Sequence, residues 1–336
     1  MLRRVGYSAI SIFGLSILIF VIARVLPGDP ARLALGPRAP QSAVDALRAA
    51  MHLNDSIPVQ YAYWIEGIFT GNWGISLFTQ RNVLLDVEQF LPATIELILS
   101  AAIIDIIIAV PLGLVAGRYA NSPADNLVRL ISYLGIAIPS FVVAIMLQLF
   151  LGYGTHLFPI IGRLSQSVTP PPTITGLYTI DSLLTGNFST FGNAAWHLIL
   201  PALALALGPL AQEARIMRSA VVENMRGDYT LSEISHGLPE RTISLKYLMK
   251  PSLIPTITIY ALDISALIAN AFLIELIFNW PGFSRYGLNA MLSKDLNAIV
   301  AVVLVAGILF AIANILVDLI VGYLDPRIRL QGRSEE

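Results

Sequence analysis

The chain contains six apolar stretches, most of them long enough to cross a lipid bilayer, for which a helix needs roughly 20 mostly apolar residues. Hydrophobic residues make up 56% of the 336 residues and charged residues only 13%, whereas soluble proteins carry about 25% charged residues. The sequence therefore predicts an all-α polytopic membrane protein with six transmembrane helices. These are residues 7–26, 93–116, 130–151, 196–211, 253–278 and 299–324.

The fourth stretch is the shortest and contains two prolines, Pro201 and Pro209. A proline inside a helix removes one backbone hydrogen bond and crowds the preceding turn. We therefore expect this helix to be bent, or to be extended by the turn that follows Gln212.

Charge and cysteine content exclude several classes of protein. The formal net charge is −1 and no basic block is present, so a nucleic-acid partner is not expected. The sequence has no cysteine, which excludes disulfides, thiolate metal sites and cysteine nucleophiles. The four histidines lack the H-E-x-x-H spacing of zinc enzymes, so neither a metal site nor a catalytic residue is expected.

Lysine and arginine are distributed unevenly along the chain. If the N-terminus is inside, 13 of them fall in the inner segments and seven in the longer outer segments. Because positive residues accumulate on the cytoplasmic side, we expect a multi-pass protein of the plasma or inner membrane with both termini in the cytoplasm.

The outer segments have a character of their own. Residues 40–53 have the pattern of an amphipathic helix, and the run YAYWIEGIF at 61–69 offers aromatic side chains suited to the membrane interface. The run TPPPTITG at 169–176 predicts extended, turn-rich backbone rather than helix.

A polar segment interrupts the apolar pattern at residues 227–255, GDYTLSEISHGLPERTISLKYLMKPSLIP. We expect a short helix over 229–236 that ends at Gly237, since glycine readily takes the left-handed backbone found after helix C-termini.

A second helix is expected to follow at once. Pro239 and Glu240 suit a first helical turn, and Pro251 is expected to stop this helix before the fifth span. The prediction is a helix–glycine–helix elbow at the cytoplasmic surface.

Residues 213–255 resemble the signature loop of ABC-importer permeases, and within these the dipeptide/oligopeptide permease family. Four further motifs agree in the expected order, so the resemblance covers nearly the whole chain and implies a type I ABC importer permease fold. They are LPGDP at 26–30, LPATIEL at 91–97, FNWPGFSR at 278–285 and LDPRIR at 324–329. The run SEISH at 232–236 departs from the Ala-rich, basic start usual in such loops, which indicates a docking surface suited to a particular partner.

The resemblance implies an organisation in three parts. Residues 1–92 form an N-terminal transmembrane helix with an extracytoplasmic loop. Residues 93–330 form a permease core of five transmembrane helices with a cytoplasmic coupling loop at 213–250, and residues 331–336 form a cytoplasmic tail.

In this family the elbow is the coupling helix, which sits in a cleft of a cytoplasmic ATPase subunit. The implied partners are a second homologous permease subunit, two cytoplasmic ABC ATPase subunits and an extracytoplasmic substrate-binding protein, within membrane lipid. The chain has no G-x-x-x-x-G-K-[ST], so we expect no cofactor on this chain, with ATP and magnesium bound by the partner subunits. The implied docking residues are Tyr229, Ser232, Glu233, Ile234, Ser235, His236, Gly237 and Leu238.

Aspartates lie inside the predicted spans. A carboxylate at the centre of a spanning helix costs about 2.5–3.5 kcal/mol on insertion scales, so each should face protein or water. The family's fifth span lines the translocation pathway, which makes Asp263 and Asn270 pathway candidates. Asp105, in the second span, is a further candidate, with a buried polar contact as the alternative.

The run FNWPGFSRYGLNAML at 278–292 combines a turn with a helix. Pro281 and Gly282 fit the middle of a type II turn, Trp280 suits the outer membrane interface, and residues 283–292 can form an amphipathic helix. The resemblance places Trp280, Pro281 and Gly282 near the outer gate.

The function implied by the resemblance is that of a permease subunit of an ATP-driven importer. It would form half of the pathway for peptides or similar oligomeric solutes, with oligosaccharides or nickel as alternative substrates within the family. From the residues alone, a secondary transporter or channel that uses the intramembrane aspartates is an alternative. An intramembrane protease would need a serine with a partnered base or two paired aspartates; Asp105 and Asp263 are the candidate pair, and neither lies in a catalytic motif.

Overall fold

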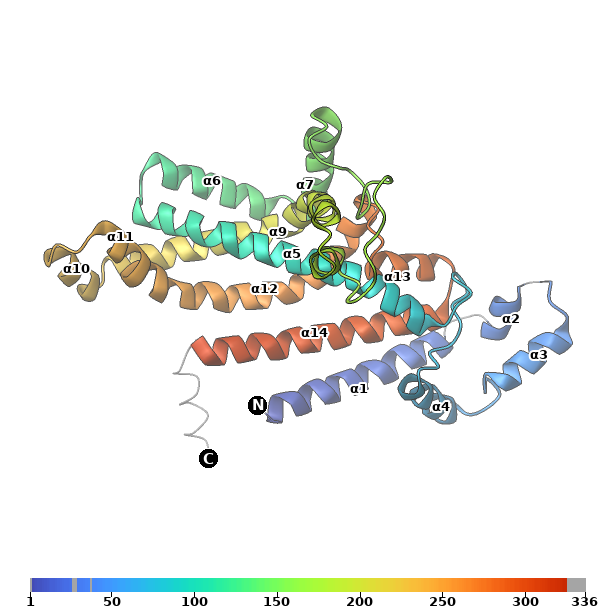
Figure 1. The fold of residues 1–336 in the computed structure, drawn as a ribbon. Coiled ribbons are helices and arrows are strands. Elements are labelled where there is room, and N and C mark those ends of the chain that lie inside the picture. Colours follow the sequence, from blue (N-terminus) through green and yellow to red (C-terminus); the bar gives the residue numbers. More distant parts are fainter. Residues whose placement is uncertain (1, 26–28, 37, 325–336) are drawn as a thin grey trace. The chain divides into compact units, whose positions relative to one another are not determined.

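The computed structural model describes residues 2–25, 29–36 and 38–324, and these ranges are predominantly helical (Figure 1). In these ranges the only β pairing is an isolated bridge between Ile75 and Asn82. The chain divides into two compact units, one made of Met1–Thr94 and Pro281–Ile312, the other of Ile95–Trp280 and Ala313–Glu336. The predicted all-α class is confirmed.

The first unit is built around the amphipathic helix α13, whose bounds match the predicted 283–292. Its buried core includes Val83, Val87, Phe283, Tyr286 and Val305. The helices of this unit are α1 (Leu2–Val25), α2 (Pro30–Leu35), α3 (Gln41–Ala50), α4 (Ile57–Thr70), α13 (Phe283–Leu292), the start of α5 (Val83–Arg118) and most of α14 (Leu296–Leu324). The amphipathic helix predicted for 40–53 is α3.

The second unit is centred on α9, against which α6, α7, α8 and α12 pack. Residues 169–176 contain no helix, as predicted for the proline-rich run. The elements of this unit, besides the rest of α5 and α14, are α6 (Pro123–Ala137), α7 (Ser140–Leu147), the π-helix η1 (Gln148–Gly154), α8 (Tyr178–Leu184), α9 (Phe188–Met225), α10 (Asp228–Ser235), α11 (Glu240–Thr242), the π-helix η2 (Ile243–Met249) and α12 (Lys250–Ile277).

Four helices, α1, α5, α9 and α14, are individually long and apolar enough to cross a membrane. Two bent helix pairs are also apolar enough together, one formed by α6 with α7–η1 and one by the helical run from α11 through α12, which bends by 52°. Counting each bent pair as one span gives the predicted six.

The predicted third span, 130–151, is not one straight helix. Its two halves, α6 and α7–η1, meet at 109°. Ile138 between them is extended, with φ −90° and ψ 123°, because the ring of Pro139 disfavours helical backbone in the residue before it. This proline was overlooked as a helix breaker.

The fourth span is longer than the predicted 196–211. Helix α9 passes through Pro201 and Pro209 and ends only at Met225, so of the two expected outcomes the extension is observed. The first residues of the predicted coupling loop, 213–225, are consequently part of a spanning helix.

Helix α5 approaches α9 closely through two glycines. A Cβ at Gly113 would lie 2.5 Å from Cβ of Met217 and 2.7 Å from the Ala214 carbonyl oxygen, and one at Gly117 would lie 2.6 Å from Cβ of Val221. The two glycines form a G-x-x-x-G pattern, which lets helix backbones pack together where lipid provides no hydrophobic driving force between helices.

We expect Gly113→Ala to destabilise the protein, whereas Gly192→Ala, the same change at an exposed position of α9, should not. An overpacked core contact costs roughly 1–3 kcal/mol. At Gly192 an added Cβ meets nothing within 4 Å, so alanine should be neutral or gain about 0.5–1 kcal/mol of helix stability. The melting temperatures of both variants in detergent measure this, and equal melting temperatures would contradict the close α5–α9 contact.

Candidate functional site

Helix α10 is a short helix that ends at a left-handed glycine. Gly237 has a φ of +72°, and its amide donates to the carbonyl of Ile234 at 3.0 Å. The amide of Leu238 donates to the carbonyl of Glu233 at 3.3 Å. These two hydrogen bonds make a Schellman motif, so the predicted short helix and its glycine stop are confirmed.

Helix α10 is fixed to the rest of its unit at both ends. At its start, Thr230 is fully buried, and the Tyr229 hydroxyl donates to the side-chain carbonyl of Asn224 on α9. At its end, Leu238 packs against a buried cluster from α9 and η2, formed by Met217, Val221, Ile243 and Leu248. Helix α10 is therefore attached to both α9 and η2.

The second arm of the elbow does not stop at Pro251, contrary to prediction. Elements α11, η2 and α12 follow one another without a break, and Pro251 is the second residue of α12. A proline is tolerated in the first turn of an α-helix, where its missing N–H is not needed, and the wider π-helical turn of η2 comes directly before it. The arm is therefore continuous with α12, the predicted fifth span. At the start of the arm, Oε1 of Glu240 lies 3.5 Å from Nη2 of Arg118 at the end of α5.

The predicted docking residues lie together on α10 and the turn after it. Two large apolar side chains among them are exposed, Tyr229 by 47% and Ile234 by 42%. Leu231, which the sequence reasoning left out, is exposed by 49%, and its spacing of three from Ile234 is the signal that would have included it. Of the others, Ser232, Ser235, His236 and Gly237 are exposed, and Glu233 and Leu238 are partly buried.

Two acids, Asp105 of α5 and Glu213 of α9, are buried beside one another. The two residues are at most 1% exposed, and their carboxyl groups are close enough to interact with each other. Among the described residues, no N–H or O–H group donates a hydrogen bond to any of their four carboxyl oxygens. Asp263 of α12 is near both and accepts a hydrogen bond from Gln212 at 3.3 Å. Sequence reasoning missed Glu213 because it ended the fourth span before this residue.

Asn270 lies apart from this acid cluster of Asp105, Glu213 and Asp263. It follows Asp263 by seven residues on α12, which is about 10 Å along a helix, and its side chain is exposed. The structure therefore brings Asp105 and Asp263 together and leaves Asn270 further along the same span.

The turn after α12 is built on Asn279, and the prediction of a type II turn at Pro281 and Gly282 is wrong. Gly282 has φ −100° and ψ 175°, whereas the third residue of a type II turn needs a positive φ. Asn279 has φ +48°, and the Trp280 amide donates to the carbonyl of Glu275 at 2.8 Å. Asparagine enters the left-handed region more readily than most residues.

Trp280 is fully buried, and its place at the outer membrane interface stays a prediction. Burying a large aromatic ring is favourable when neighbouring side chains pack closely around it. The guanidinium of Arg163 lies 5.9 Å from the ring centroid.

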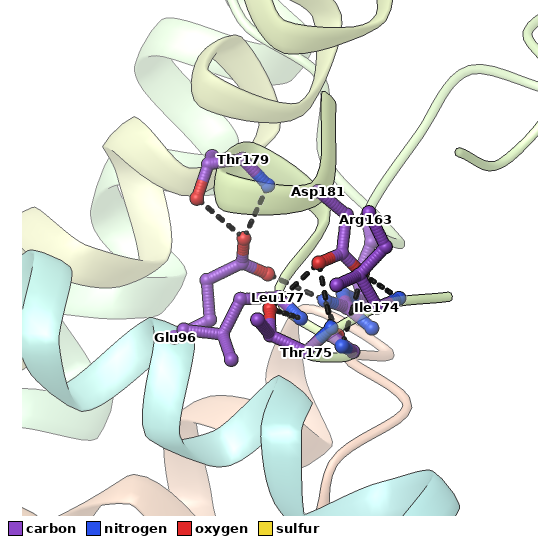
Figure 2. Close-up of polar contacts among 8 residues, drawn as sticks. Glu96, Arg163, Ile174, Thr175, Leu177, Thr179 and Asp181 are labelled. Carbon is purple, nitrogen blue, oxygen red and sulfur yellow. Dashed lines mark hydrogen bonds and ion pairs between the residues drawn. The ribbon is translucent and has the colours of Figure 1, made fainter. Parts of the chain in front are cut away.

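Arg163 and Glu96 form a buried ion pair that the sequence reasoning did not predict (Figure 2). Nη2 of Arg163 lies 2.5 Å from Oε2 of Glu96 and donates to the carbonyl of Gly176 at 2.9 Å. The other carboxylate oxygen of Glu96 accepts from the backbone amide and the hydroxyl of Thr179, both at 2.7 Å. The guanidinium also lies 3.5 Å from the ring centroid of Tyr178.

Asp181 organises the loop that brings these groups to Glu96 (Figure 2). Its carboxylate accepts from the amides of Ile174, Thr175 and Gly176 at 3.2, 2.8 and 2.9 Å, and from the Thr175 hydroxyl at 2.7 Å. Burial by itself would raise the pKa of Asp181, but these hydrogen bonds outweigh it and lower the pKa. The proline-rich loop is therefore an ordered element anchored on the second span.

Two protein-family models match the chain. One, described as the binding-protein-dependent transport system inner membrane component, covers residues 109–330. The other, the N-terminal region of such membrane components, covers residues 1–98. The chain belongs to this family.

Curated relatives align with this permease along almost their whole length. It is 36% identical to the probable D,D-dipeptide transport system permease protein of Escherichia coli, over 95% of this chain and 94% of that protein. It is 35% identical to the dipeptide transport system permease protein of Alkalihalophilus pseudofirmus, over 95% of each, and 32% identical to the di/tripeptide permease protein of Pseudomonas aeruginosa, over 98% of each.

Family membership confirms a non-catalytic, multi-pass permease component of the inner membrane. Binding-protein-dependent transport implies a binding protein and ATPase partners. Of the motifs that carried the resemblance, residues 26–28 of LPGDP and residues 325–329 of LDPRIR lie outside the described residues, as does the predicted tail at 331–336.

We expect Arg163→Gln and Glu96→Gln each to lower the stability of the permease, because each leaves a buried polar group without its partner. Removing one member of a buried pair typically costs about 3–5 kcal/mol. The double variant should lose much less than the sum of the two single losses. Melting temperatures of the purified protein in detergent measure all three.

Arg48→Gln is the matched control. Nη2 of Arg48 and Oδ2 of Asp29 are also 2.5 Å apart, but both side chains are about one-third exposed. Such exposed pairs contribute roughly 0–1 kcal/mol to stability. Additive losses in the Glu96 and Arg163 variants, or losses no larger than in the control, would contradict a coupled buried pair.

Proposed function

We propose that this chain is one of two homologous permease subunits in an ATP-driven importer of peptides. The observation that carries the proposal is the ordered elbow at α10, a rigid protrusion with exposed apolar side chains in a chain that has no nucleotide-binding motif of its own. The full-length similarity to relatives named as dipeptide and di/tripeptide permeases supports peptides as substrates over oligosaccharides or nickel.

The elbow docks into a cleft of an ABC ATPase subunit in the cytoplasm, with one ATPase subunit under each permease and ATP and magnesium held by the ATPases. Tyr229, Leu231 and Ile234 supply apolar contact area, and exposed apolar side chains ringed by polar ones are typical of protein interfaces. The polar residues of the ring are Ser232, Glu233, Ser235 and His236, and Gly237 and Leu238 set the turn.

Both termini lie in the cytoplasm in this proposal, and the binding protein docks on the opposite side. The excess of lysine and arginine on the elbow's side supports this orientation. The outer gate then lies near Trp280, Pro281 and Gly282, where the fifth span ends.

The pathway runs along α12. Asp263 is partly exposed and Asn270 is exposed, so both are placed to face a water-filled passage between paired permeases. Asp105 and Glu213 lie behind Asp263, buried against each other. Membership of a binding-protein-dependent family favours ATP-driven import over the ion-coupled transport that these acids would also permit.

We expect Gly237→Val to release the ATPase subunits while leaving membrane insertion and permease pairing intact. A Cβ at Gly237 would meet no atom within 4 Å, so the effect comes from the left-handed backbone alone, which costs a non-glycine residue roughly 1–2 kcal/mol. Docking is measured as the amount of ATPase subunit recovered per permease after detergent extraction. Transport is measured as ATP-dependent uptake of a labelled dipeptide in the presence of its binding protein.

Gly237→Asn is the matched control, because asparagine tolerates the left-handed region. It should retain most of the docking and uptake that valine abolishes. Normal recovery and uptake in the valine variant would mean that the elbow is a solvated loop without a coupling role.

A further inference from the structure

A small basic cavity lies between α6 and α9 in the second unit. Its volume is about 170 Å³, and polar side chains contribute most of its lining, namely Arg129, Ser132, Tyr133, Arg215, Arg218 and Ser219. The two helices run side by side here (Figure 1). A space of this size holds a phosphate group with its substituents.

Positive charge is in excess at this cavity. Arg218 donates to both carboxylate oxygens of buried Asp125, through Nη2 at 2.8 Å and through Nε. Arg129 also approaches this carboxylate, with Nε at 3.9 Å. Arg215 is exposed, and no acid in the described part of the chain pairs with it. Two guanidinium groups thus share the carboxylate of Asp125, and Arg215, the third at the cavity, is left to attract an anion.

The cavity lies near the ends of α6 and α9 that face the cytoplasm in the orientation given above. Arg129 follows the first residue of α6 by six positions, and Arg218 precedes the last residue of α9 by seven. At 1.5 Å per residue both lie about 9–10 Å from their helix ends. The headgroup layer on each side of a bilayer is about 5–8 Å thick, so a bilayer surface at these helix ends would put the cavity near the boundary between headgroups and hydrocarbon.

An exposed apolar side chain continues the line of the cavity along α6. Ile136 is 42% exposed, and its spacing of three from Tyr133 and seven from Arg129 places it on the same stripe of the helix as these cavity residues. Tyr133 at the cavity is 59% exposed, and tyrosine is enriched where headgroups meet acyl chains. This is a surface for an acyl chain next to a pocket for its phosphate.

We propose that this cavity binds the phosphate headgroup of an anionic phospholipid, with Arg215 as the main ligand and the acyl chains lying along α6. Basic pockets between spanning helices on the cytoplasmic side are suited to such headgroups. The phosphate bridges α6 and α9, and Arg218 stays in place through its pair with Asp125. In the orientation given above, the lipid belongs to the inner leaflet.

The test uses the complete transporter, stripped of lipid in detergent and titrated with phosphatidylglycerol while bound lipids are counted by native mass spectrometry. Arg215→Gln should weaken binding by roughly tenfold or more, since it removes a charge-assisted hydrogen bond to the phosphate. Arg215→Lys should retain part of the affinity. Arg226→Gln removes the same charge from an exposed position at the end of the same helix, outside the cavity, and should change little.

Two further arms identify the source of the phosphate and guard against misfolding. Phosphatidylcholine should bind far more weakly, and inorganic phosphate should not displace phosphatidylglycerol. If Arg215→Gln lowers the melting temperature of the lipid-free transporter, Arg129→Gln repeats the test at a second ligand. Unchanged phosphatidylglycerol affinity in the arginine variants, equal binding of phosphatidylcholine, or displacement by inorganic phosphate would overturn the proposal.

Discussion

The close contact of α5 with α9 through Gly113 and Gly117 is the interaction on which the second unit depends. Inside a bilayer, apolar surface gains nothing by leaving lipid for protein, so helices associate through tight packing and polar contacts. Because Gly113 and Gly117 have no side chains, α5 packs directly against Met217 and Val221 of α9, close to the buried pair Asp105 and Glu213. Burying two acids here is costly, and the close glycine contact lets the helices hold them against each other.

Helix α9 extends from the acid cluster to the elbow, at the end of the helix that is proposed to lie in the cytoplasm. Its last turns contribute Met217 and Val221 to the cluster that receives Leu238, and Asn224 to the contact with Tyr229. The elbow is therefore attached to α9 on one side and, through η2, to the fifth span on the other. A push on α10 by an ATPase subunit would reach the acid cluster through packed helices.

The sequence predicted the elements that depend on local chemistry and missed those that depend on distant neighbours. The four long spanning helices follow from apolar length, and the stop at Gly237 follows from glycine's backbone freedom. The prediction that Pro251 ends a helix was wrong, because the energetic cost of a proline depends on its position in the helix. Pro251 lies in the first turn of α12, directly after the π-helical turn of η2. Asn279 was overlooked in favour of the commoner glycine turn. The pairing of Arg163 with Glu96 spans 67 residues, and no spacing rule connects positions so far apart.

If α10 transmits the motion of an ATPase subunit, it moves as one body with α9 and with α6, which packs on α9. Spin labels at Ser235 on α10 and at Leu134 on α6, both exposed positions of the second unit, would report their separation in the complete transporter by double electron–electron resonance. A rigid elbow gives one narrow distance distribution that is the same without nucleotide and with ATP trapped in the ATPase subunits. A broad distribution, or a distance that changes between these states, would contradict it.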